Sequence, residues 1–315
     1  MAEATMQAAA RGDACAPLGP TRDERRRERR RRMRTDTLPA LVTVGPTFLW
    51  MIPFVAVPLV YVLAMSFAST GSNYEVVFGF APDNYLHLLD PTYLQVYAQS
   101  LAIAALATLA CLAVGYPFAY LISRTFRSRK TLLYMMVIIP FWTCSLIRIY
   151  GWRTFLGTTG PLNTFLEGAG LVSEPLELLY TQGATALGMA YIMFPYMVLP
   201  LYSALEKLDQ SQIEASIDLG AGFLATIFRV VVPQTMSGVF SGVIMVFVPS
   251  LGAFFVSDIL GGGNTNVVGN LIERAFQSGN NWPLGAALSI ALIVITLVLV
   301  KLYQRAGGDI ESLGV

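Results

Sequence analysis

The chain has 315 residues, of which 55% are hydrophobic and only 13% are charged. Polar and charged residues are too few to cover an ordinary water-soluble domain, so the composition excludes that class and indicates a protein embedded in a bilayer. The formal net charge of +1 excludes little, because it averages a strongly basic N-terminal segment with long, nearly uncharged blocks.

The N-terminal segment, residues 1–37, is polar and ends in an arginine cluster that runs from Arg22 to Arg34. Its composition predicts a mostly disordered tail. An arginine run can bind nucleic acid, but one directly before an apolar block more often holds the tail at the anionic cytoplasmic face of a membrane. We therefore expect a basic cytoplasmic tail and no nucleic-acid partner.

Six apolar blocks follow, each of about 20 residues or more, which is the length a helix needs to cross roughly 30 Å of hydrocarbon. The predicted membrane helices are Leu41–Phe67, Tyr97–Ile122, Thr131–Tyr150, Ala184–Leu205, Thr235–Leu260 and Leu284–Tyr303. The first block is too long for the core of a signal peptide and is expected to remain as helix 1. The sequence thus predicts an all-α membrane domain of six transmembrane helices over residues 38–315.

Lysine and arginine placement orients these helices, because positive charges collect on the cytoplasmic side of a membrane. With the N-terminus inside, all of the 21 Lys and Arg residues except Arg148, Arg153 and Arg274 fall in predicted inner segments. We therefore predict a multi-pass membrane protein with both termini in the cytoplasm.

Residues that ligate metals are few and do not lie at ligand spacing. The three cysteines, Cys15, Cys111 and Cys144, form no disulfide framework and are expected to be reduced and structural. For the single histidine, His87, a surface or packing role is expected, and no metal site is predicted.

Between predicted helices 4 and 5 lies an amphipathic segment, residues 208–233, on the cytoplasmic side in this orientation. Ser211 with Glu214 has the pattern of a capping box, and Gly220 suits the left-handed position that ends a short helix. A second short helix is predicted over Phe223–Val231. A purely structural interpretation would take the glutamate as a cap and the glycine as a turn.

The spacing of this segment resembles the signature of the permease subunits of ATP-driven, binding-protein-dependent importers: Glu-Ala-Ala, three residues, Gly, nine residues, Ile-x-Leu-Pro. The matching positions are Glu214, Ala215, Ser216, Gly220, Val230, Val232 and Pro233. A serine replaces the second alanine and valines replace isoleucine and leucine, without a change in spacing. The proline also suits the start of helix 5, where a missing N–H costs nothing.

The resemblance implies a protein of the bacterial inner membrane with the fold of type I ABC importer permeases. This segment would then form the coupling helices that dock on a separate ATP-hydrolysing subunit. Apolar side chains are expected to face that partner from Ile213, Ile217, Phe223 and Ile227. The chain has no GxxxxGK[ST] loop, so we expect a non-catalytic subunit without cofactors, with ATP and Mg bound by the partner.

Three further stretches look like spermidine/putrescine permeases: residues 141–151, 200–209 and 256–258 before the glycine run at Gly261. The resemblance covers roughly residues 40–305. It implies a polyamine substrate, two copies of an ATPase, a second related permease and a periplasmic solute-binding protein. Related permeases carry other small amines and organic solutes, which stay as alternatives.

A solute path is suggested by helix breakers at Pro140, Pro195, Pro200, Pro249 and Gly252. Proline frees backbone carbonyls at membrane depth, which need a polar or wet neighbourhood and suit ammonium groups. The alternative for each proline is a kink that serves packing alone.

Asp258 is an acid embedded in an apolar block, and intramembrane ionisable residues are functional candidates. It is expected either to bind a cationic amine or to pair with Arg148. Aromatic walls, each contributing about 0.5 to 2 kcal/mol to a cation, are expected from Phe141, Trp142, Tyr150, Phe254 and Phe255. Packing is the alternative role for these rings.

Two other classes of membrane protein fit less well. A membrane-embedded enzyme is disfavoured because the sequence has no HExxH motif, no paired intramembrane aspartates and no serine elbow beside a histidine. A transporter driven by ion gradients has no need of the Glu214 to Pro233 segment, so deleting that segment would spare its transport.

Overall fold

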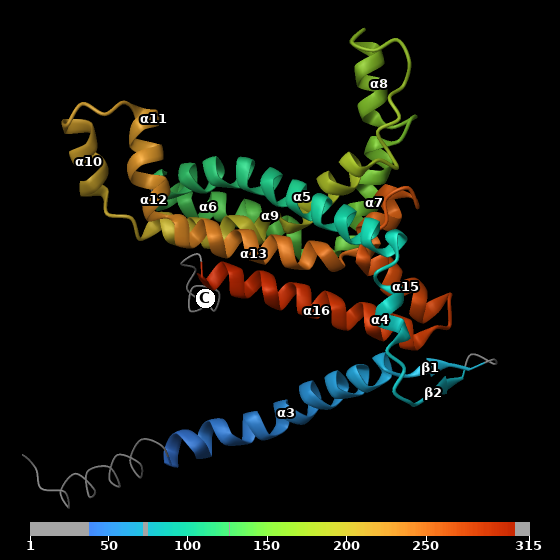
Figure 1. Ribbon diagram of the computed structural model, residues 1–315. Coiled ribbons are helices and arrows are strands. Elements are labelled where there is room, and N and C mark those ends of the chain that lie inside the picture. Colours follow the sequence, from blue (N-terminus) through green and yellow to red (C-terminus); the bar gives the residue numbers. More distant parts are fainter. Residues whose placement is uncertain (1–37, 72–74, 126, 306–315) are drawn as a thin grey trace, which may run out of the picture. The chain divides into compact units, whose positions relative to one another are not determined.

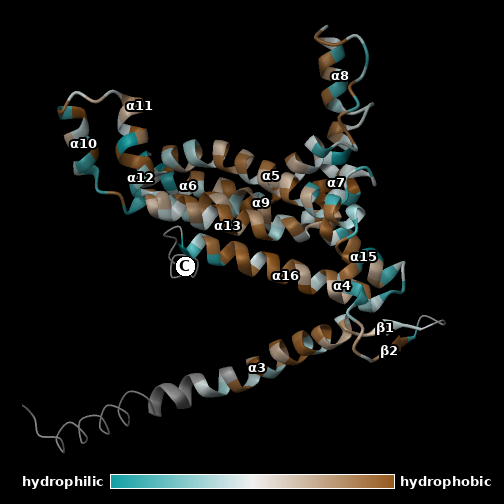
Figure 2. Cartoon of the chain, viewed as in Figure 1, coloured by the Kyte–Doolittle hydropathy of each residue, from teal (hydrophilic) through white to brown (hydrophobic). Residues whose placement is uncertain are grey.

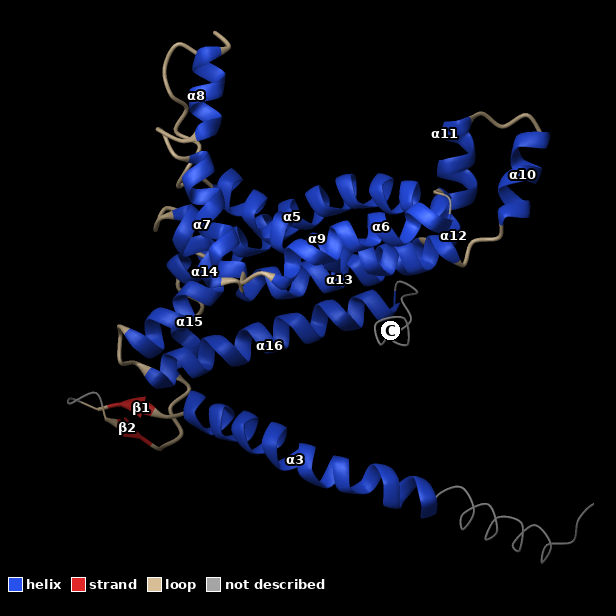
Figure 3. Cartoon of the chain, turned by 180° about the vertical axis from the view of Figure 1, so that it is seen from behind, coloured by secondary structure: helices blue, strands red, loops and turns tan. Residues whose placement is uncertain are grey.

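The computed structural model describes residues 38–71, 75–125 and 127–305. The predicted basic tail with its cluster from Arg22 to Arg34 lies outside the described residues. Within them the chain is helical (Figure 3), apart from a short antiparallel pair of strands, β1 (Ser69–Thr70) and β2 (Val76–Val77). The predicted all-α class is confirmed.

The chain divides into two units, Met1–Tyr61 and Val62–Val315. Most of helix α3 (Leu38–Ser66) belongs to the first unit. Apolar residues continue along the whole helix, and the rings of Trp50 and Phe54 lie 4.5 Å apart between centroids. This helix confirms the first predicted span.

The second unit continues through helices of very different lengths (Figure 1). Its long helices are α5 (Pro91–Arg124), α9 (Gln182–Glu206), α13 (Met236–Gly252) and α16 (Trp282–Arg305). The shorter ones are α4 (Asp83–His87), α6 (Arg127–Ile138), α7 (Ser145–Leu156), α8 (Pro161–Gly168), α10 (Gln210–Asp218), α11 (Phe223–Thr226), α12 (Val232–Gln234), α14 (Phe254–Val256) and α15 (Val268–Gln277). Between them lie a 3₁₀ turn, η3 (Ile139–Trp142), and two π-helical turns, η4 (Ile227–Val231) and η5 (Ser257–Gly261).

Four of the described helices are long and apolar enough to cross a membrane alone. They comprise Gly45–Ser66, Pro91–Arg124, Gln182–Glu206 and Trp282–Arg305. Two more spans are bent pairs: Arg129–Trp142 with Ser145–Gly168, at 92°, and Phe223–Gln234 with Met236–Gly252, at 70°. The described chain reaches the predicted six spans when each bent pair counts as one.

Predicted helix 3 changes at Pro140 and is bent by 92° a few residues later, at Thr143 and Cys144. Proline lacks the N–H of a regular helix and clashes with the preceding turn. Helix α6 therefore ends at Ile138 and tightens into η3, and Thr143 is extended with ψ 152° before α7 begins. The predicted span over Thr131–Tyr150 is therefore present as a bent pair of helices, and the interruption that was expected at Pro140 appears as the 3₁₀ turn η3.

The other predicted breakers behave differently from one another. Helix α9 continues through Pro195 and Pro200 without interruption. Helix α13 also contains Pro249 but ends at Gly252, where Ala253 leaves the helical region with ψ 63°. Predicted helix 5 is thus interrupted near its end and continues only through α14 and η5.

Helices α5, α9 and α13 pack side by side and form the core of the second unit (Figures 1 and 3). Gly238 and Gly242 lie four residues apart on α13, the small-residue spacing that lets membrane helices approach closely. A Cβ at Gly238 would meet the Ala204 Cβ at 2.5 Å, and one at Gly242 would meet the Met197 Sδ at 2.7 Å. The close contact between α13 and α9 therefore requires glycine at position 238, whereas a side chain at position 242 would displace the Met197 thioether.

Short helices lie at the two ends of this core, with α10 and α11 at one end and α7 and α8 at the other (Figures 1 and 3). Figure 2 shows hydrophobic residues along α13 and α16 and hydrophilic residues at α10. The predicted amphipathic segment is thus set apart from the apolar length of the core helices.

Candidate functional site

The amphipathic segment forms a pair of helices joined by a tight turn, which we call the α10–α11 hairpin (residues 209–234). Asp209 is its N-cap, and its Oδ1 accepts the backbone N–H of Ser211 at 3.0 Å. This hydrogen bond lowers the pKa of the Asp209 carboxyl below its ordinary 3.8, because it stabilises the charged form. The predicted capping box is wrong, since Ser211 already lies inside α10, one turn ahead of Glu214.

Gly220 ends α10 as predicted. Its φ of +82° lies in the left-handed region that glycine adopts without strain. The Gly220 N–H donates to the Ile217 oxygen at 2.8 Å, and the Ala221 N–H donates to the Ser216 oxygen at 3.1 Å. These two bonds form a Schellman motif, which satisfies the last carbonyls of α10 and turns the chain back.

The second helix of the hairpin is less regular than the predicted helix over Phe223–Val231. Helix α11 widens into the π turn η4 and then continues as α12. The Ser216 Oγ lies 3.1 Å from the Thr226 Oγ1, so a hydrogen bond links the two helices. Ser216, which replaces the second alanine of the signature, therefore stabilises the hairpin from within.

The hairpin carries apolar side chains that this chain does not cover. Exposures between 57% and 89% are found for Ile217, Leu219, Phe223, Leu224 and Phe228. Glu214 and Ala215 are exposed as well, and Ile227 is half-buried. Ile213 is 6% exposed and packs in the core of its own chain, so the prediction that it faces a partner is wrong. Exposed apolar patches of this kind are found where proteins contact other proteins or a membrane.

Thr235 joins the hairpin to α13 at the 70° bend. Its Oγ1 lies 2.9 Å from the Tyr116 hydroxyl on α5 and donates to the Val231 oxygen at 2.9 Å. The last three positions of the signature lie beside this joint, with half-buried Val230 and Val232 and exposed Pro233. The joint is therefore held to the core by a polar contact between helices distant in sequence.

At the opposite end of the core, Asp258 is held by an asparagine. Its Oδ1 accepts the Asn270 Nδ2 at 2.6 Å. Asn270 is fully buried, donates also to the Phe254 oxygen at 3.2 Å and accepts the Val267 N–H at 3.0 Å. The amide thus ties α14, η5 and the start of α15 together, and the Asp258 side chain stays exposed.

Arg148 does not pair with Asp258 in the described part of the chain, so that predicted alternative is wrong. Its guanidinium carbon lies 4.4 Å from the ring centroid of Phe141 and 5.8 Å from that of Tyr191. The Nε and Nη1 atoms are buried and, among described residues, have no hydrogen-bond partner. Phe141 therefore already contacts a cation of its own chain.

The remaining aromatic candidates are not gathered into one wall. Trp142 is 81% exposed and Tyr150 is 52% exposed. Phe254 packs edge-on against Phe255, with centroids 6.3 Å apart. The structure thus brings Phe254 close to Asp258 through Asn270, and Phe141 close to Arg148, as two separate groups. The single histidine, His87 at the end of α4, lies 3.6 Å from the carboxylate of Asp90, and both side chains are exposed.

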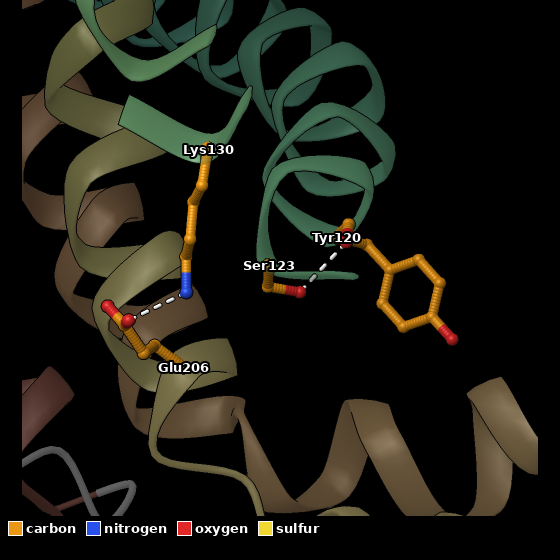
Figure 4. Close-up of polar contacts among 4 residues, drawn as sticks. All are labelled: Tyr120, Ser123, Lys130 and Glu206. Atoms are coloured by element: carbon orange, nitrogen blue, oxygen red, sulfur yellow. Dashed lines mark hydrogen bonds and ion pairs between the residues drawn. The ribbon is translucent and has the colours of Figure 1, made fainter. Parts of the chain in front are cut away.

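One charged pair was missed by sequence reasoning. The Lys130 Nζ on α6 donates to the Glu206 Oε1 at the end of α9, at 2.7 Å (Figure 4). Figure 4 also shows the end of α5 beside it, where the Ser123 hydroxyl donates to the Tyr120 carbonyl at 2.8 Å. A usable signal existed, since both charges flank apolar blocks on the same predicted side of the membrane.

The sequence matches a family model described as "Binding-protein-dependent transport system inner membrane component" over residues 25–306. It is 45% identical to the spermidine/putrescine transport system permease protein PotB of Haemophilus influenzae, over 84% of this chain and 93% of that protein. It is 42% identical to PotB of Escherichia coli K12, over 82% of this chain and 94% of that protein.

The fold is similar to that of a chain in the crystal structure of a bacterial alginate ABC transporter in complex with an alginate pentasaccharide-bound periplasmic protein. The TM-score is 0.70 at 17% identity, with 87% of this chain and 95% of that chain covered. A second structure of a bacterial ABC transporter for alginate gives 0.65 at 18% identity, with 89% and 98% covered. The predicted permease fold of type I ABC importers is confirmed.

Proposed function

Because the chain belongs to the family of binding-protein-dependent transport system inner membrane components, we propose that it is a transmembrane subunit of an ATP-driven importer for polyamines such as putrescine and spermidine. The observation that carries the substrate is the 45% identity, over most of both chains, to a permease named for these amines. Import then proceeds by alternating access of a path between membrane helices.

The α10–α11 hairpin is the proposed contact with the ATP-hydrolysing subunit. Its apolar side chains are exposed at the end of the core, while Ile213 packs into the core and the Ser216–Thr226 hydrogen bond links the two helices of the hairpin. The proposed coupling residues are Glu214, Ala215, Ser216, Gly220, Val230, Val232 and Pro233. Docking on this surface would move the joint at Thr235 and, through it, α13.

The proposed assembly contains two copies of the ATPase, which bind ATP and Mg, a second related permease and a periplasmic solute-binding protein. Residues 38–315 form its membrane domain, and both termini face the cytoplasm. That orientation places the hairpin on the side where ATP is available. A periplasmic protein would then dock near α7, α8 and α15, at the opposite end of the core.

The proposed solute path runs past Asp258, whose exposed carboxylate suits an ammonium group. The nearby Phe254 ring offers a face for a cation. Phe141, Trp142 and Tyr150 remain candidates further along the path. Arg148 lies over Phe141 and would repel a polyamine there, which favours the Asp258 side of this end of the chain.

Uptake of radiolabelled putrescine and spermidine by cells that lack the gene, and by cells in which it is restored, tests the substrate. Restoration should recover saturable uptake of at least one of the two amines. Cells carrying a chain without residues 214–233 serve as the matched control and should take up neither. Unchanged uptake of both amines in the deletion strain would contradict the polyamine assignment.

A further inference from the structure

A cavity of about 540 Å³ lies between α6, α9 and α13, near the end at which α9 meets the hairpin. Three tyrosines line it, Tyr134, Tyr196 and Tyr202, together with the Glu206 carboxylate. A second cavity of about 680 Å³ shares Tyr134, Tyr202 and Glu206 with the first. Aromatic rings around one carboxylate are a favourable environment for an organic cation.

Lys130 lies where these two cavities meet. It lines the second cavity, and its Nζ bonds the Glu206 Oε1 at 2.7 Å (Figure 4). The same ammonium lies 5.2 Å from the centroid of the Tyr202 ring. The chain's own primary ammonium is thus held by a carboxylate and an aromatic ring, the two contacts that the terminal ammonium of an alkylamine would seek.

We propose that Glu206 and the surrounding tyrosines form a subsite for an alkylammonium group, and that Lys130 fills it in this conformation as an internal competitor. The proposal rests on the proposed function, because it places an amine subsite near the hairpin end of the solute path. It concerns a different end of the core from the Asp258 candidate.

A second lysine, Lys207, determines how the Lys130–Glu206 ion pair affects binding of an amine. Lys207 also lines the first cavity, so the site has an excess of positive charge while Lys130 neutralises Glu206. Such a site repels an ammonium group. When Lys130 moves away, the Glu206 carboxylate balances Lys207 and the tyrosines become available to an amine. The ion pair therefore switches the subsite between retaining and releasing its ligand.

Alkylation of a thiol in the cavity wall tests the subsite. Ser237→Cys supplies the thiol at an exposed position of the first cavity, in a full chain whose exposed Cys144 and whose Cys15 are replaced by serine. In native membrane vesicles, putrescine should slow alkylation by a neutral maleimide, whereas butane-1,4-diol should not. Lys130→Gln should lower the putrescine concentration that gives half-maximal protection by up to about fivefold. Glu206→Gln should raise that concentration by a similar factor, as expected for one exposed ion pair.

Two controls separate a ligand site from a structural salt bridge. Glu167→Gln, at an exposed acid on α8, should leave protection unchanged. Lys130→Glu combined with Glu206→Lys keeps an ion pair for the fold but takes the carboxylate out of the first cavity, which residue 130 does not line, so protection of a thiol in that cavity should be lost. Full protection in this double variant would overturn the proposal.

Two outcomes distinguish the subsite from the substrate assignment. If vesicles and cells import putrescine but it never slows alkylation, the subsite is wrong and the polyamine importer stands. If putrescine protects in a manner that depends on Glu206 while neither amine is imported, the ammonium subsite stands and the polyamine assignment falls.

Discussion

Two regions of the second unit use apolar residues in opposite ways. In the core of α5, α9 and α13, side chains such as Met197 and Leu201 are completely buried, and glycines bring α13 against α9. In the α10–α11 hairpin, Leu219 and Phe223 are mostly exposed, although polar hydrogen bonds define the backbone around them. Packing within one chain therefore explains the core sequence, whereas it leaves the exposed apolar side chains of the hairpin without a contact that would explain them, which is why we propose that this surface docks on the ATPase.

The largest expected effect is at the turn of the hairpin. Gly220→Pro should reduce amine uptake by about tenfold or more. Proline fixes φ near −65°, where Gly220 has +82°, and it removes the N–H that donates to the Ile217 oxygen. The melting temperature of the purified protein should fall only slightly, since Gly220 itself has nothing within 4 Å of where a Cβ would lie.

The neighbouring glycine provides the matched control for this turn. Gly222 has φ −69° and open space around its Cα, so Gly222→Ala should transport normally. Normal transport-coupled ATP turnover in the Gly220→Pro protein would show that the hairpin is not the coupling element.

The second effect is in the core and should be on folding. Gly238→Val places a side chain against the Ala204 Cβ and the Pro200 carbonyl, and such overpacking destabilises by about 1–3 kcal/mol. Thermal denaturation of the purified protein should shift down, and uptake should fall in proportion to the folded amount. Gly151→Ala, where nothing lies within 4 Å, is the control. If the Gly238→Val protein melted normally but did not transport, the core glycine would serve transport and not folding, and the contrast between core and hairpin would be wrong.

The third effect separates charge from packing at Asp258. Asp258→Asn keeps an acceptor for the Asn270 amide but removes the negative charge. Uptake of a dication should fall about threefold to tenfold, the range expected for the loss of one favourable charge contact. Transport of a neutral solute, if one is accepted, should change less. Equal losses for both would identify the aspartate as a folding residue.

The smallest effect concerns the hairpin's N-cap and its pH dependence. The folded-state pKa of Asp209 lies below 3.8, so its capping contribution is complete above that value and is lost as the pH falls through the lowered pKa. Asp209→Ala should speed amide hydrogen exchange in the first turn of α10 at neutral pH, whereas Asp209→Asn, also a good cap, should not. Identical exchange in all three proteins would show that the cap does not order the hairpin.

Much of the fold follows from local patterns in the sequence. Apolar block length identifies the spans, and the left-handed turn at Gly220 follows from the absence of a side chain. The wrong N-cap shows where local patterns stop, because Asp209 and Ser211 are both good capping residues two positions apart. Which of the two residues becomes the N-cap depends on where α9 ends, because the linker from Glu206 determines where α10 can begin.

The contacts of the candidate site were less predictable because they join distant parts of the chain. Arg148 and Asp258 have opposite charges at a similar predicted depth, yet Asp258 bonds Asn270 and the arginine lies over an aromatic ring. Ile213 matches an exposed apolar face in sequence but is buried in the core. Only the packing of the helices decides which way each side chain faces.

The wide turn η4 has a consequence for how the hairpin is oriented. A π turn accommodates one residue more than an α-helix needs over the same stretch, and each residue rotates a helix by about 100°. Removing one residue from Ile227–Val231 would restore a regular α-helix. The exposed Phe223 and Leu224 side chains would then be rotated about the helix axis by that angle. The extra residue thus determines the direction in which the exposed leucine and phenylalanine side chains of the hairpin point.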